Sequence, residues 1–172
     1  MAKILTVYYS RKGENYFGGE IRSISKGNTE RVAEFIQEAV GGDLFELETV
    51  REYSKDYHEC TNEAMAEKKA GARPALKKLP KSIDEYDTIF LGYPNWWSTA
   101  PMAVFTFLDA FNFSGKTIIP FCTNEGSGLG SSEADIRREC PGAAVESGLS
   151  IRGSEAADSK NRVTKWALGK VR

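Results

Sequence analysis

The chain has 172 residues, of which 41% are hydrophobic and 27% are charged, and a formal net charge of −1. This size and composition are typical of a globular domain with a real core, so we expect a single domain over residues 1–172 and exclude disordered and collagen-like chains. The balanced charge excludes the strongly basic face of a nucleic-acid-binding protein.

The first part of the chain predicts two strands and one helix around a polar loop. Residues 4–9 form a β-branched and aromatic run that is typical of a buried strand. Residues 11–27 are rich in glycine, serine and lysine and predict a loop. Residues 28–40 carry apolar side chains at helical spacing, and Gly41-Gly42 ends that helix. Residues 43–49 alternate apolar and acidic side chains, as expected of a strand near a sheet edge.

The second part continues the alternation of helices and strands. Two unbroken apolar runs, residues 88–93 and 116–122, predict strands covered on both faces. A weaker fifth strand is expected within residues 143–151. Four helices are expected: residues 61–70 with a thin apolar face; one opened by Pro101 and capped by Ser98 or Thr99; one capped by Ser131 or Ser132 and running to Glu139; and one starting at Asp158 or Ser159.

This order of elements predicts an α/β fold with a five-stranded parallel sheet and helices on both faces. In such a sheet, ligands bind outside the carboxyl ends of the strands, where the strand order reverses. The loops that directly follow the strands are therefore the places where a binding site is expected.

The loop after the first strand predicts an anion site. It contains Ser10 and Arg11 and returns through Lys26 and Gly27 to the start of a helix at Asn28. A helix N-terminus presents unpaired N–H groups and a partial positive charge. No Glu or Gln follows Asn28 at the spacing of a capping box, so these donors stay available. The alternative is a tight turn with solvated charges.

The other two loops predict surroundings for a flat ligand. Trp96 and Trp97 follow the strand at 88–93, where they could form a stacking wall for an aromatic ligand or complete a hydrophobic cap. Glycines at 126, 128 and 130 follow the strand at 116–122 and allow the backbone to approach a ligand closely. These glycines are no dinucleotide fingerprint, because that motif follows the first strand.

Other chemistries find little support in the sequence. The single histidine, His58, has no nucleophile motif around it and is expected to be a surface or lid residue. Cys60, Cys122 and Cys140 form no C-x-x-C pair, and free thiols suit a reducing compartment, so we expect a cytoplasmic protein. We predict no catalytic residue, no metal site, no nucleic-acid partner and no membrane span.

Three segments resemble the flavodoxin family: ILTVYYSR…KGNTERVAEFI, LGYPNWWSTAPMAVFTFLD and IIPFCTNEGSGLGSS. The resemblance implies a flavodoxin-like three-layer sandwich and FMN as the cofactor. It implies that the FMN phosphate is cradled by six residues: Ser10, Arg11, Lys26, Gly27, Asn28 and Thr29. It also implies two loops around the isoalloxazine, one formed by Pro94, Asn95, Trp96 and Trp97 and one by Thr123, Asn124, Glu125, Gly126, Ser127 and Gly128.

Two segments depart from short flavodoxins. Residues 12–25 split the phosphate loop, which resembles a flavodoxin-like subgroup, and they leave open whether Lys12 or Lys26 reaches the phosphate. This insertion could form a hairpin over the flavin or contact a partner. Residues 53–74 have no clear counterpart.

The resemblance implies an FMN-binding electron-transfer flavoprotein whose redox partner is an unidentified protein or a quinone. Glu125 is expected near the ring, where its charge would disfavour an anionic reduced flavin. An alternative of the same fold is an oxidoreductase, an NAD(P)H-dependent quinone or flavin reductase, which needs a ring face open to nicotinamide. A third possibility is an interaction module without a cofactor. The net charge of −1 lacks the acidic excess common among flavodoxin carriers and keeps the reductase alternative open.

Overall fold

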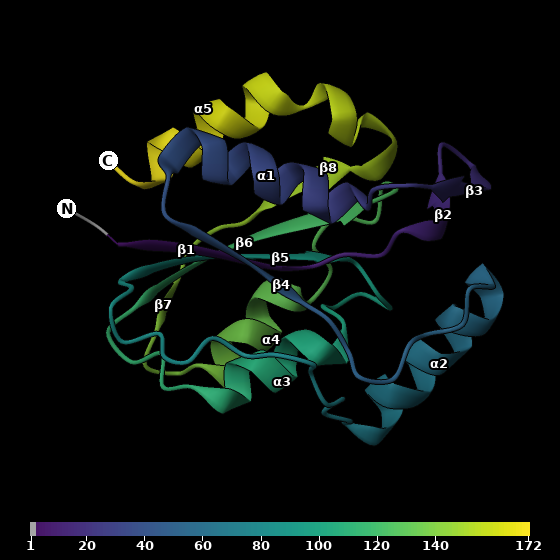
Figure 1. The fold of residues 1–172 in the computed structure, drawn as a ribbon, viewed down its shortest axis with the longest axis horizontal. Coiled ribbons are helices and arrows are strands. Elements are labelled where there is room, and N and C mark those ends of the chain that lie inside the picture. Colours follow the sequence, from purple (N-terminus) through teal and green to yellow (C-terminus); the bar gives the residue numbers. More distant parts are fainter. Residues whose placement is uncertain (1–2) are drawn as a thin grey trace.

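The computed structural model describes residues 3–172, in which a parallel sheet lies between two layers of helices (Figure 1). The sheet has the strand order β4-β1-β5-β6-β7, and β8 also pairs with β6. Its strands are β1 (Ile4–Tyr9), β4 (Asp43–Leu47), β5 (Thr88–Pro94), β6 (Thr117–Asn124), β7 (Ala144–Val145) and β8 (Leu149–Arg152). The helices are α1 (Asn28–Val40), α2 (Tyr57–Ala70), α3 (Met102–Ala110), α4 (Ser132–Glu139), the 3₁₀-helix η1 (Gly153–Asp158) and α5 (Lys160–Lys170).

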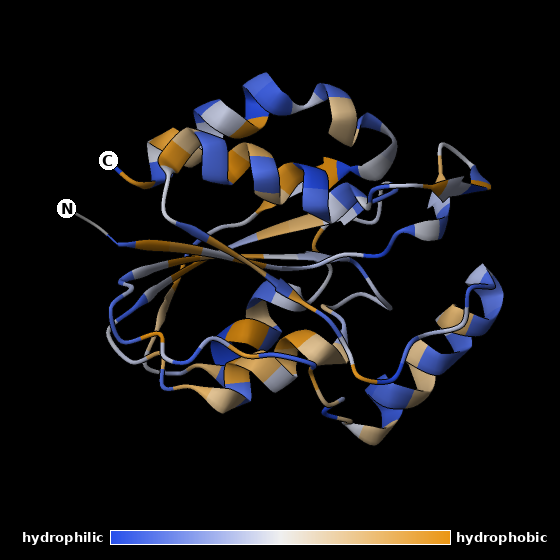
Figure 2. Ribbon diagram, in the orientation of Figure 1, coloured by the Kyte–Doolittle hydropathy of each residue, from blue (hydrophilic) through white to orange (hydrophobic). Residues whose placement is uncertain are grey.

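The three central strands are apolar on both faces because each face is covered by helices. All six residues of β1 are buried. Ile4 and Tyr8 pack toward α1 and α5, whereas Leu5 and Val7 belong to the larger core cluster on the side of α3 and α4. Figure 2 shows the hydrophobic colours concentrated along these strands and on the inner sides of the helices. The predicted α/β fold with a parallel sheet and helices on both faces is confirmed.

The strand order places a switch point between β1 and β5. The chain leaves β1 through α1 to β4 on one side, and then crosses to β5 on the other side. The loops after β1 and β5 therefore leave the sheet in opposite directions and open a crevice between them. In Figure 1 this end of the sheet lies on the right, away from both chain termini.

Three predicted boundaries are corrected by local hydrogen bonds. The fifth strand is split into β7 and β8, because the Gly148 N–H donates to the Glu133 carboxylate at 2.7 Å instead of continuing a ladder. β4 ends at Leu47, and Thr49 forms an antiparallel bridge with Leu76. α2 begins at Tyr57 rather than residue 61, because the Asp56 side chain caps it.

The helix caps also differ from those expected. α3 follows Pro101 and has no side-chain cap, since the Thr99 hydroxyl donates to Asp135 instead. Ser131 and Ser159 occupy the N-cap positions of α4 and α5 without a capping side-chain bond. No helix in the described part of the chain is both long enough and apolar enough to cross a membrane.

Residues 13–24 form a hairpin where the composition predicted a loop. β2 (Gly13–Phe17) and β3 (Glu20–Ile24) make a separate antiparallel two-stranded sheet. Gly18 and Gly19 both have positive φ, 64° and 93°, which is the requirement of a tight two-residue hairpin turn. The prediction of a loop was wrong here, and its hairpin alternative is what the structure has. Figure 1 shows the hairpin beyond the carboxyl end of the sheet, close to the upper end of α2.

Candidate functional site

Two cavities lie at the carboxyl end of the sheet, and Arg11 lines both. The first, the loop cavity, has a volume of about 460 Å³. The second, the edge cavity, has a volume of about 770 Å³ and lies beside the ends of β1 and β4. Both volumes fall in the range of small-molecule sites.

The predicted site residues divide between these cavities. The loop cavity is lined by ten of them: Arg11, Asn28, Pro94, Asn95, Trp96, Trp97, Thr123, Asn124, Glu125 and Ser127. Ser10 and Gly27 line the edge cavity together with Arg11. Lys26, Thr29, Gly126 and Gly128 line neither cavity.

The N-terminus of α1 is open to a ligand. Gly27 is its N-cap residue and has no side chain that could accept a hydrogen bond from the first turn. The Ser10 hydroxyl accepts a hydrogen bond from the Glu30 N–H at 3.1 Å. Within residues 3–172, no acceptor is found for the Asn28 and Thr29 N–H groups. Two backbone donors at the positive end of the helix dipole are thus available for an anion.

Two glycines keep the backbone around this helix start tightly packed. A Cβ on Gly27 would lie 2.0 Å from the Ser10 hydroxyl oxygen and 2.9 Å from the Arg11 carbonyl oxygen. A Cβ on Gly153 would lie 2.4 Å from the Asn28 side-chain nitrogen. A Cβ on Gly27 would therefore push against the Arg11 backbone, whereas a Cβ on Gly153 would displace the Asn28 side chain.

Thr29 connects the start of α1 to the end of β6. Its side chain is buried, and its hydroxyl hydrogen-bonds to the Thr123 hydroxyl at 2.7 Å. This bond joins the first turn of α1 to the end of β6. The Thr29 hydroxyl therefore serves the packing of the predicted phosphate loop against the neighbouring strand.

The lysines near the helix start differ in their surroundings. The Lys26 ammonium pairs with the Glu34 carboxylate on α1 at 2.5 Å, and this bond raises the Lys26 pKa. Lys12 is exposed and lines the edge cavity beside Ser10 and Gly27. Within residues 3–172, Lys12 has no ion-pair partner. Of these two lysines, Lys12 is therefore the one without an ion-pair partner.

The adjacent tryptophans have different environments. Trp96 is partly buried and packs edge-on against the rings of Tyr9 and Tyr53, with centroid distances of 5.3 and 5.1 Å. Trp97 is 44% exposed, and its indole N–H donates to the Thr61 carbonyl of α2 at 2.8 Å. Trp96 is thus fixed by the core, whereas Trp97 offers an accessible ring at the loop cavity.

The loop that carries the tryptophans has an unusual backbone. Trp97 and Ser98 have φ angles of 57° and 70°, in the left-handed region that side chains other than glycine and asparagine rarely adopt. The Ser98 N–H donates to the Asn95 side-chain oxygen at 2.9 Å, which supports this conformation. Such local strain is common where a loop must present a side chain to a ligand.

The two ligand loops are tied to each other. The Asn95 side chain donates to the Gly128 carbonyl at 2.8 Å, and the Asn95 N–H donates to the Thr123 carbonyl at 2.9 Å. The Asn124 side-chain oxygen accepts the N–H groups of Gly126 and Gly128 at 2.9 and 3.0 Å. These glycines thus shape the loop, and their N–H groups are already used within it.

Glu125 faces the hairpin and η1. Its carboxylate accepts the Gly18 N–H at 3.2 Å and both the N–H and the hydroxyl of Ser154 at 3.1 Å. The Arg152 guanidinium lies 3.8 Å away and offsets its charge. Glu125 thereby connects the hairpin turn at Gly18 to η1 at Ser154.

Several lining residues of the loop cavity were not predicted. They come from the hairpin and from α2, and they are Asn15, Tyr16, Tyr57, Cys60, Thr61 and Ala64. The rings of Tyr16 and Tyr57 lie 6.3 Å apart, and burial raises the pKa of the Cys60 thiol to about 11. The only sequence signal was that both segments depart from the pattern of short flavodoxins, which does not predict where they lie in space.

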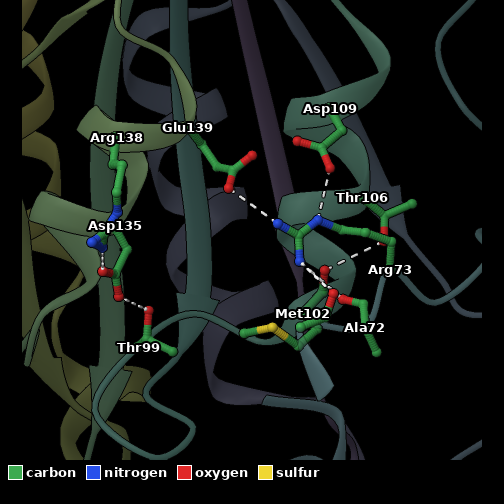
Figure 3. A network of polar contacts seen from close by, with 10 residues as sticks. Ala72, Arg73, Thr99, Met102, Thr106, Asp109, Asp135, Arg138 and Glu139 are labelled. Atoms are coloured by element: carbon green, nitrogen blue, oxygen red, sulfur yellow. Dashed lines mark hydrogen bonds and ion pairs between the residues drawn. The ribbon is translucent and has the colours of Figure 1, made fainter. Parts of the chain in front are cut away.

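The tryptophan loop is anchored to α4 through Asp135 (Figure 3). The carboxylate accepts the Thr99 hydroxyl at 2.6 Å and the Ser131 hydroxyl at 2.8 Å, and it pairs with Arg138. Burial would raise the Asp135 pKa, but these bonds outweigh it and hold the pKa below its ordinary value. In the same view Arg73 bridges α3 and α4 by pairing with Asp109 and Glu139 at 2.7 and 3.0 Å.

We expect the variant Asp135→Asn to lose stability at neutral pH but not in acid. A carboxyl with a lowered folded-state pKa stabilises the fold above its unfolded-state pKa of about 4, and this stabilisation disappears as the pH falls through the folded-state pKa. Urea unfolding midpoints from pH 6 to pH 3 should therefore converge for the variant and the unaltered protein. A difference that stays constant with pH would contradict this role of Asp135.

Comparison with known proteins gives consistent matches. A family model described as Flavodoxin matches residues 21–169. A flavoprotein structure from Bacteroides uniformis is 30% identical over 97% of this chain and 98% of that chain, with a TM-score of 0.77, and one from Bacteroides eggerthii is 28% identical over 95% and 98%, with a TM-score of 0.73. A flavoprotein from Lactobacillus acidophilus in complex with FMN is 20% identical over 92% and 98%, with a TM-score of 0.68. No curated protein matches the chain.

Proposed function

The chain belongs to the flavodoxin family, and from this premise we propose that residues 1–172 form one flavodoxin-like domain that binds FMN and transfers electrons. The similar fold of a protein described as a complex with FMN supports this cofactor. The observation that carries the proposal is the open N-terminus of α1 beside Gly27, where a Cβ would fill the space at the Ser10 hydroxyl. A phosphate fits a cradle of free backbone N–H groups.

FMN, when bound, supplies one- and two-electron transfer, and the protein supplies binding, orientation and electrostatics. The Asn28 and Thr29 N–H groups and the Lys12 ammonium are the donors available to the phosphate. Trp97 presents an accessible ring at the loop cavity, and Trp96 packs edge-on against Tyr9 and Tyr53. The paired hydroxyls of Thr29 and Thr123 keep the phosphate loop and the ring loop in fixed relation.

The absorption spectrum of the purified protein tests this function most directly. A yellow protein with flavin bands, or a colourless one that gains them on addition of FMN, is the expected result. A colourless protein that binds no added FMN would overturn the proposal and favour an interaction module. The three cysteines are buried and unpaired, which supports a reducing compartment such as the cytoplasm.

An NAD(P)H-dependent reductase of the same fold is the second candidate function. The near-zero net charge supports this candidate, because it does not favour a soluble carrier that is steered to a protein partner. A net charge of −1 provides little long-range steering toward a basic protein partner. A steady-state assay with NADPH and a quinone separates the two functions. Turnover of about ten per second without a partner reductase would be an ordinary enzyme rate and would establish the reductase.

We expect Lys12→Met to weaken FMN binding by roughly tenfold, because it removes the uncommitted cation beside the phosphate cradle. Lys26→Met is the matched control, since the Lys26 ammonium is paired with Glu34 and its loss should change FMN affinity less than about twofold. Fluorescence titration with FMN and riboflavin measures both variants, and riboflavin affinity should change in neither. A larger effect of Lys26→Met would identify Lys26 as the phosphate cation.

A further inference from the structure

Arg11 occupies the boundary between the two cavities, and its guanidinium is directed at backbone carbonyls. Nε donates to the Glu14 carbonyl at 2.9 Å. Nη2 donates to the Ser54 carbonyl at 2.9 Å and to the Lys55 carbonyl at 3.2 Å. Among residues 3–172, no carboxylate lies within ion-pair distance of Arg11. The side chain therefore crosslinks three backbone positions.

These carbonyls line the edge cavity, and they belong to the two segments whose other residues, Asn15 and Tyr16 in the hairpin and Tyr57 to Ala64 in α2, form walls of the loop cavity. Glu14 is in β2 of the hairpin, and Ser54 and Lys55 directly precede the N-cap of α2. A second bond joins the same walls, because the Glu14 carboxylate accepts the Tyr57 N–H at 2.8 Å. The Asn15 side chain in turn donates to the Arg11 carbonyl at 2.9 Å. The end of β1, the hairpin and α2 thus form one connected polar unit around Arg11.

Neither wall has much apolar packing of its own. α2 buries only Cys60 and Ala64, and Figure 2 shows much of it in hydrophilic colours. β3 contains mostly exposed residues, and the Tyr16 side chain of β2 is 46% exposed. Where apolar burial is small, the position of an element depends on its polar contacts. The guanidinium of Arg11 provides three such contacts from one rigid group.

We propose that Arg11 is a positioning residue that holds the hairpin and α2 as walls of the flavin site, in place of the phosphate contact that the sequence resemblance implied. This inference rests on the proposed FMN binding only for its affinity measurements. A guanidinium is a planar fork of donors, and an ammonium is a compact point charge, so lysine cannot reproduce three contacts in two directions. Phosphate, by contrast, is bound well by lysine. The two roles therefore respond differently to the same substitution.

The variant Arg11→Lys separates the two roles by its effect on two flavins. Positioning predicts that FMN and riboflavin affinities both fall by roughly tenfold, so that their ratio is unchanged. The matched control is Arg22→Lys, on the same hairpin, where the guanidinium pairs with Glu20 and lines neither cavity. Arg22→Lys should bind both flavins as the unaltered protein does. Unchanged binding in Arg11→Lys, or a loss confined to FMN, would overturn the proposal.

Amide hydrogen exchange of the apoprotein supplies a readout that needs no flavin. Arg11→Lys should exchange faster than the unaltered protein in residues 13–24 and 54–70, with no change in β5 and β6, and Arg22→Lys should leave residues 54–70 unaffected. Unchanged exchange in both segments of Arg11→Lys would refute the positioning role. If the unaltered protein binds neither flavin, the proposed function fails, while the exchange measurement still decides the role of Arg11.

Discussion

Replacing Gly27 by alanine is expected to weaken FMN binding roughly a hundredfold, which corresponds to about 2.7 kcal/mol. The backbone of Gly27 has φ −65° and ψ 149°, which alanine adopts without strain, so the effect is steric. The added methyl group would lie 2.0 Å from the Ser10 hydroxyl oxygen and 2.9 Å from the Arg11 carbonyl oxygen. The loop must move away from the start of α1, and the N–H donors then no longer converge on one phosphate.

Riboflavin and a second glycine provide the controls for this result. Riboflavin lacks the phosphate, so its affinity for Gly27→Ala should fall less than that of FMN. Gly169→Ala adds the same methyl group in α5, where nothing lies within 4 Å, and should leave FMN binding unchanged while stabilising the fold by about 0.5–1 kcal/mol. Isothermal titration calorimetry measures the flavin affinities, and urea unfolding measures the stability of the two variants. Equal losses of FMN and riboflavin in Gly27→Ala would show that the anion site lies elsewhere.

The largest effect on stability is expected from Gly92→Ala, which should lower the free energy of unfolding by about 3 kcal/mol. Gly92 lies in β5 and pairs in register with Phe121 of β6. An added Cβ would lie 2.1 Å from Cζ and 2.2 Å from Cε2 of the Phe121 ring, which is fully buried. The ring cannot swing into solvent, so either it adopts a strained rotamer or the two strands separate. Urea unfolding measures this loss as a lower midpoint, and we expect the m-value to be unchanged.

The double variant Gly92→Ala with Phe121→Leu tests whether this clash is the cause. Leucine removes the ring edge that meets the new methyl group, so the double variant should lose less stability than the sum of the two single variants. A double-mutant cycle gives the difference, which we expect to be at least about 1 kcal/mol. Strict additivity would mean that Gly92→Ala acts through the strand backbone and not through Phe121.

The sheet edge at which the cavities lie could be predicted from sequence because parallel strands bring distant loops to one edge. The loops after residues 9, 93 and 122 were recognisable from the apolar runs before them, and all three contribute to the loop cavity. The roles of the individual side chains could not be predicted in the same way. Adjacent loop residues point in directions set by φ and ψ, and the left-handed backbone at Trp97 and Ser98 has no sequence signature. The sequence predicts that at most one of the two tryptophan rings belongs to the core, and only the structure shows that it is Trp96.

Residues 12–25 show a second limit of sequence reasoning. Their abundance of glycine and serine indicates a loop, yet Gly18-Gly19 supplies a hairpin turn. Composition averages over the segment, whereas a hairpin depends on two residues at one place. The difference between Lys12 and Lys26 also depends on tertiary contacts, because the Glu34 carboxylate of α1 pairs with Lys26.

The sequence by itself determined the alternation of the sheet strands with helices, the parallel sheet, the sheet edge at which the two cavities lie and the resemblance to flavodoxins. These properties follow from local periodicity and from hydrophobic burial, which each segment carries in its own residues. Only the tertiary structure decided that the hairpin and α2 become walls of the cavity, that Arg11 spans between them and that Glu125 faces Ser154. Such contacts join residues that are far apart in the sequence, 43 positions for Arg11 and Ser54 and 107 positions for Gly18 and Glu125. They are directional hydrogen bonds, whose geometry exists only once the whole chain is folded.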